Sequence, residues 1–128
     1  MNEIQIIQSQ LATERLHFNE VASACAAALQ AGHFSARRDF AAACAAYFAF
    51  AVTRLPGIST SPQADAPDGE WRQFLQAFST QVTQHFAAID ALVTRNLPVT
   101  EWRARSRIDA DSIVTERERY ARVKAAAP

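Results

Sequence analysis

The 128-residue chain has a mass of 14.1 kDa, is 49% hydrophobic, and balances thirteen basic against thirteen acidic residues. This length suits one domain with a core of its own, and the composition excludes a disordered or collagen-like chain. A net charge of zero gives no general attraction to nucleic acid or to anionic lipid, so we expect neither nucleic acid nor a membrane as a partner.

Two cysteines, Cys25 and Cys44, each lie within an apolar helical pattern and form no Cys-x-x-Cys motif. We interpret them as reduced packing residues. No segment contains the run of about 18 apolar residues that a membrane span requires, and the first residues do not resemble a secretory signal. We therefore expect a cytoplasmic protein.

Apolar residues that recur at alternating steps of three and four predict four helices. The expected helices cover residues 2–31, 35–55, 69–97 and 99–124. Gly32 can close the first helix in a left-handed conformation, and Ser35 is the expected N-cap of the second. Pro56 follows the second helix and begins a long loop, whereas Pro98 marks a short junction before the fourth.

Each predicted helix has an apolar stripe that must be buried against the others. Two short connections and one longer connection join the four helices. We therefore predict an all-α fold, with residues 1–128 forming a single up-down-up-down four-helix bundle.

Polar residues interrupt these stripes near the middle of the predicted helices. Glu14 and His17 form a Glu-x-x-His pair, a spacing that metal-carboxylate bundles use to hold ions. At ~1.5 Å per residue, Glu14, His17 and His85 lie at about 18, 22 and 22 Å along the predicted bundle. The other interruptions fall between about 16 and 27 Å. They are Tyr47, Asp109 and Glu116.

A buried group of carboxylates and imidazoles needs internal partners, an ion or water. One interpretation is a site for a single iron, manganese or zinc ion. Its candidate ligands are Glu14, His17, His85, Asp109 and Glu116. Tyr47 and Ser106 would support these ligands or contact a bound molecule. The other interpretations are a hydrogen-bond network that fixes helix register and a small polar pocket for an organic ligand.

The helix order, the long connection after the second helix and the segment Leu11–Val21 resemble hemerythrin-like domains, four-helix bundles with iron ligands in mid-helix. On this resemblance, His17 and His85 take histidine positions of the family and Asp109 matches the bridging aspartate. Gln81 stands where a second histidine of the third helix would be, which makes it a further supporting residue. The family's His-x-x-x-Glu of the second helix is replaced by Tyr47 and Ala51. The resemblance therefore implies a mononuclear or metal-free relative.

We expect a hemerythrin-like bundle with a sensing or binding role, whose central polar site binds one divalent metal ion or a small ligand. The alternative is a non-enzymatic protein-interaction module, in monomeric or homodimeric form, with a purely structural polar layer. Enzymatic activity has little direct support, because no Gly-rich phosphate loop, nucleophile elbow or His-Glu-x-x-His motif is present. The arginines of the last predicted helix alternate with acidic residues, as on a solvated helix face.

Overall fold

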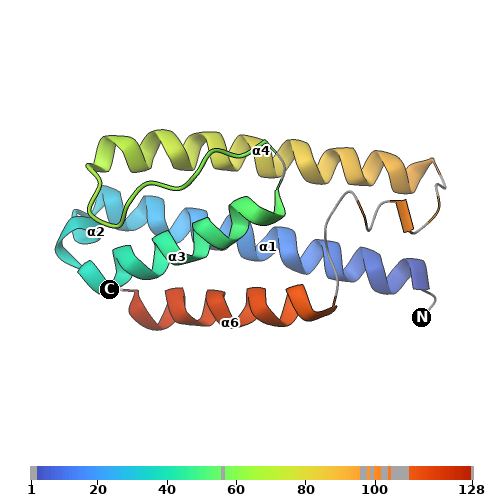
Figure 1. Cartoon of the computed structure of the whole chain (residues 1–128), viewed down its shortest axis with the longest axis horizontal. Helices are drawn as coiled ribbons and strands as arrows, with labels where there is room; N and C mark the ends of the chain where they lie inside the picture. Colours follow the sequence, from blue (N-terminus) through green and yellow to red (C-terminus); the bar gives the residue numbers. More distant parts are fainter. Residues whose placement is uncertain are drawn as a thin grey trace.

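The computed structural model describes residues 3–55, 57–95, 98, 100, 101, 104 and 110–127. The described residues form helices and no strand, and four long helices pack as a bundle (Figure 1). The helices are α1 (Glu3–Gln30), α2 (His33–Ala36), α3 (Arg38–Arg54), α4 (Asp68–Thr94) and α6 (Ala110–Ala126). The predicted all-α class and four-helix bundle are confirmed. None of the described helices combines the length and the hydrophobicity needed to cross a membrane.

The helix boundaries follow local backbone chemistry. α1 ends at Gln30, and Gly32 takes the left-handed conformation with φ 75°, as predicted. The predicted second helix is interrupted at Arg37, whose φ of −111° and ψ of 83° lie outside the helical region. Ser35 therefore lies inside the short α2 instead of capping the long helix. Its hydroxyl donates a hydrogen bond of 2.6 Å to the carboxylate of Asp68 at the start of α4.

The directions of α3 and α4 are set by the long connection between them. Residues 57–67 return along the length of the bundle, so α3 and α4 run in the same direction (Figure 1). Ring contacts agree with this, because Phe34 packs on Trp71 near the start of α4 and Phe48 packs on Phe78 further along. An extended segment of this length reaches about 36 Å, which exceeds the roughly 25 Å of α3. The four long helices thus run up, down, down and up, where we predicted strict alternation.

Aromatic rings fill the bundle interior and hold the helices at fixed distances. Phe48 contacts the rings of Trp71 and Phe78, with centroid distances of 6.1 and 4.8 Å. Phe18 of α1 contacts Tyr47 and Phe78 at 6.2 and 5.9 Å. Each such pair contributes about 0.5–1.5 kcal/mol beyond simple burial. Tyr47 contacts the rings of both Phe18 and Phe48, and these contacts fix the position of its hydroxyl.

Candidate functional site

Among the described residues, three charged side chains are almost completely buried. Glu14 of α1, Arg54 of α3 and Glu116 of α6 are exposed by 2, 5 and 1%. An isolated charge inside a protein costs several kcal/mol, so these groups must stabilise one another. They come from three different helices, which makes their pairing a constraint on how those helices pack.

Glu14 forms an ion pair with Arg54. The Nη2 atom of Arg54 lies 2.6 Å from Oε1 of Glu14, and both side chains are buried. Arg54 ends α3, where a positive charge also interacts favourably with the helix dipole. The carboxylate that we predicted to face a metal ion therefore faces a guanidinium.

Glu116 is bonded to Tyr47. The Tyr47 hydroxyl donates a hydrogen bond to Oε1 of Glu116, and both residues are buried. Burial, reinforced by the Glu116 carboxylate, raises the pKa of Tyr47 far above its ordinary value, so the phenol stays protonated. Burial also raises the pKa of Glu116, although the Tyr47 bond and the charges of Arg54 and Arg119 act in the opposite direction.

Two guanidinium groups surround Phe50 beside these pairs. The Cζ atoms of Arg119 and Arg54 lie 4.4 and 5.7 Å from the centroid of the Phe50 ring. A cation over an aromatic face contributes about 0.5–2 kcal/mol, depending on its exposure. The group thus contains two carboxylates and two guanidiniums. We call it the ionic layer, and its members are Glu14, Tyr47, Arg54, Glu116 and Arg119.

His17 lies in a different environment from Glu14. Its ring stacks on Tyr120 of α6 with centroids 4.9 Å apart and planes 10° apart. The Tyr120 hydroxyl donates a hydrogen bond to Glu20. Burial lowers the pKa of His17, which the negative charge of Glu20 opposes and the positive charge of Arg117 reinforces. His17 therefore belongs to the seam between α1 and α6.

The remaining predicted site residues are His85, Gln81, Asp109 and Ser106. His85 of α4 is half-buried, with its ring centroid 5.1 Å from that of Phe86. Gln81 borders a hollow between α4 and the loop that follows α3. Asp109 and Ser106 lie outside the described residues. In the described part of the chain, no group of three His, Cys, Asp or Glu side chains could hold a metal ion.

Arg54 and Arg119 are the members of the ionic layer that the sequence interpretation missed. Tyr47, Ala51 and Arg54 follow one another at steps of four and three, so they share one face of α3. The same stripe that identified Tyr47 therefore extends to Arg54. Arg119 follows Glu116 by three residues and could have been found in the same way.

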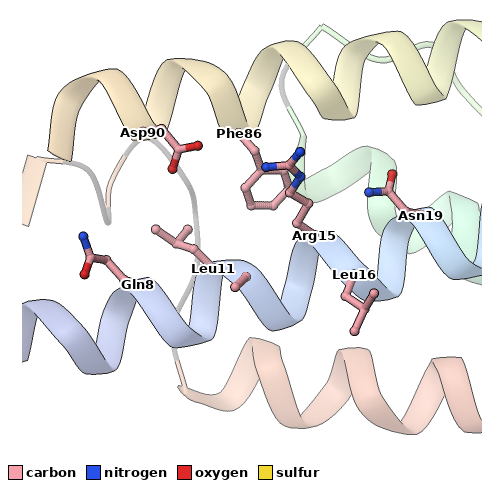
Figure 2. A pocket seen from close by; sticks show the side chains of 8 residues that line it. Gln8, Leu11, Arg15, Leu16, Asn19, Phe86 and Asp90 are labelled. Carbon is pink, nitrogen blue, oxygen red and sulfur yellow. The ribbon is translucent and has the colours of Figure 1, made fainter. Parts of the chain in front are cut away.

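Hollows also occur on the outer surface, between α1 and α4. Figure 2 shows one of about 260 Å³, with Phe86 and Asp90 extending from α4 toward α1. Leu11 and Arg15 extend from α1 toward α4 in the same view. The hollow is lined by Gln8, Leu11, Ala12, Arg15, Leu16, Asn19, Phe86 and Asp90.

Comparison of the chain with family models, with curated proteins and with solved structures finds no match. The resemblance to hemerythrin-like domains therefore stays a prediction. A four-helix bundle hosts many unrelated functions, so the function must be argued from the ionic layer and the surface.

Proposed function

We propose that this chain is a helical protein-interaction module and that its ionic layer is structural. The observation that carries the structural role of the ionic layer is the Arg54 guanidinium, placed 2.6 Å from Glu14 inside the bundle. A guanidinium at this position neutralises the carboxylate and repels a divalent cation. The paired charges link α1 and α3 in one register, which is the best-attested role of buried ionic groups.

The surface of α1 and α4 supports a binding role. Leu16 lies beside the hollow of Figure 2 and is 54% exposed, which is high for a large apolar side chain. Between Arg72 and Asp90, α4 contains no Asp, Glu, Lys or Arg. The centres of protein interfaces are depleted of charged residues in the same way. By contrast, charged residues are dense along α6.

The predicted site for one iron, manganese or zinc ion is the second candidate. The buried Oε2 atom of Glu116 favours it, because this atom has no hydrogen-bond partner among the described residues. Elemental analysis of purified protein, followed by thermal denaturation with each ion, separates the two candidates. The structural role predicts no stoichiometric metal and no rise in Tm. One bound ion per chain that is lost in His85→Ala would support the metal site instead.

Site-specific photo-cross-linking in the native cells tests the interaction role directly. A photoreactive phenylalanine analogue replaces Leu16 beside the hollow, and in a matched control it replaces Val114, which is 56% exposed on α6. We expect a cross-linked protein adduct from position 16 and none from position 114. A chain that gives no adduct from position 16 would contradict the proposed function.

A further inference from the structure

The hollow of Figure 2 is one half of a longer depression between α1 and α4. A second hollow of about 500 Å³ continues along the same two helices. It is lined by Ala22, Ser23, Ala26, Leu29, Gln30, Arg72, Leu75, Gln76 and Ser79. At 3.6 residues per turn, the residues that α1 gives to the two hollows lie on one face of the helix, and so do those of α4. We call the whole depression the α1–α4 furrow.

Opposite charges stand at the two ends of the furrow. Arg72 and Asp90 are both exposed and lie eighteen residues apart on α4. This separation equals about five helical turns, so the two residues share one face and lie roughly 27 Å apart. Neither side chain makes an ion pair within the described part of the chain. A surface with separated, opposite, unpaired charges is complementary to an inverted copy of itself.

The residues of α4 show what an inverted copy would meet. In an antiparallel pair of α4 helices centred at Gln81, Arg72 of one copy lies beside Asp90 of the other, and the reverse contact forms at the far end. Near the centre, Ser79 lies beside Thr83 of the other copy, so small polar side chains meet there.

An antiparallel pairing of the two α1 helices has its centre at the same height along the bundle as the α4 pairing. An antiparallel pair of α1 helices centred at Asn19 places Ala12 beside Ala26 of the other copy. Phe18 contacts both Phe78 and Phe86, whose midpoint in α4 is residue 82, one residue from the centre of the α4 pairing. A single two-fold axis, perpendicular to the helices, can therefore relate the two α1 helices to each other and the two α4 helices to each other.

The same symmetry gives exposed Leu16 a receiving surface. Leu16 of one copy falls beside Ala22 and Ser23 of the other, which are small residues that line the second hollow. Small side chains leave the space that a leucine needs. Arg15, the other charged residue of the furrow, falls beside the uncharged Ser23 of the other copy.

From this complementarity, we propose that the α1–α4 furrow is the interface of a two-fold, antiparallel homodimer. The inference rests on the proposed function, since it names a second copy of the chain as the partner. Gln8 to Gln30 span about 33 Å of α1, and two packed helices present a width of roughly 20 Å. The furrow therefore buries roughly 650 Å² per copy, which reaches the lower part of the range for stable interfaces.

Sedimentation equilibrium of the full chain tests the dimer. We expect wild-type protein to reach twice the chain mass of 14.1 kDa. Arg72→Glu places like charges together at both ends and should raise the dimer Kd at least about tenfold, as should Asp90→Arg. The double variant Arg72→Glu/Asp90→Arg restores opposite charges and should return the Kd close to the wild-type value. Arg122→Glu on α6 changes the net charge by the same amount as Arg72→Glu and is the matched control for that variant.

The rescue is diagnostic because Arg72 and Asp90 are too far apart within one chain to interact. Wild-type protein that sediments at the single-chain mass, or a double variant that does not recover, would overturn the homodimer. A cross-link from position 16 to a protein of another mass would overturn the homodimer and leave the proposed interaction role standing. Circular dichroism of each variant confirms that the helices are retained.

Discussion

Removal of Arg54 tests the ionic layer most directly. Arg54→Met keeps the apolar stem but leaves the Glu14 carboxylate buried without its ion pair. Removing one member of a buried pair costs about 3–5 kcal/mol, and Arg54 also stabilises the charge of Glu116, so we expect a loss in the upper part of this range. The double variant Glu14→Leu/Arg54→Met removes both charges. It should cost less than about 2 kcal/mol, because apolar side chains of similar volume can replace a buried pair.

Urea denaturation at neutral pH, followed by circular dichroism, measures these free energies of unfolding. All variants are compared at one protein concentration in a Leu16→Glu background, because dimerisation adds a concentration-dependent term to stability. Arg122→Met on the exposed side of α6 is the matched control, and we expect it to change stability by less than about 0.5 kcal/mol. A loss below about 1 kcal/mol for Arg54→Met would refute the reasoning. So would a double variant whose loss equals the sum of the two single losses.

Three further predictions concern other parts of the molecule. Burial raises the pKa of Glu116 in the folded state above its ordinary value of 4.5, so protonated Glu116 stabilises the fold below pH 4.5 and this stabilisation is lost as the pH rises through the folded-state pKa. Glu116→Gln should therefore reduce the fall in the free energy of unfolding over this pH range, measured by urea titrations at several pH values. A variant whose free energy of unfolding falls as steeply as that of the wild type would contradict the prediction. The pKa of Cys25 is raised by its hydrogen bond with Cys44 and by burial, so a thiol reagent at mildly alkaline pH should modify neither buried cysteine until denaturant is added. Gly32→Ala forces a side chain into a left-handed conformation and should lower stability by about 1 kcal/mol; a thermal scan with no loss would show that the turn relaxes.

The sequence predicted the first and third helices well because each has an apolar stripe that only burial explains. The first and third helices were placed within a few residues, at Glu3–Gln30 and Asp68–Thr94. The direction of α4 could not be predicted, because the loop after α3 is long enough for either arrangement. A loop that stays at one end of the bundle would make α4 antiparallel to α3, whereas a loop that runs the length of the bundle makes the two helices parallel. The break at Arg37 was also missed, since no Pro or Gly marks it in the sequence.

The candidate site was predicted in part. Glu14, Tyr47 and Glu116 were selected as polar interruptions of apolar stripes, and the structure places all three in the ionic layer. His17 was grouped with Glu14 by its spacing of three residues, which leaves about 60° between the two side chains around the helix. In a bundle, that angle is enough for Glu14 to face Arg54 while His17 faces Tyr120. Arg54 escaped notice because terminal arginines are usually solvated.

One helix connects the ionic layer to the furrow, and this coupling leads to a last prediction. Glu14 and Leu16 are two residues apart, so their side chains lie about 200° apart around α1. Glu14 is buried against Arg54, whereas Leu16 is exposed on the outer side. If the ionic layer sets the position of α1, Arg54→Met should weaken the dimer although Arg54 does not line the furrow.

The double variant Glu14→Leu/Arg54→Met distinguishes positioning from general damage. It removes the buried Glu14 charge that has lost its Arg54 partner and would displace α1, and so should restore most of the self-association measured by sedimentation. Dimers that are equally strong in wild type and Arg54→Met would show that the furrow is independent of the ionic layer. Dimers that are lost in both variants would show that the ion pair itself is needed and that an apolar replacement does not hold α1 in the register the interface requires.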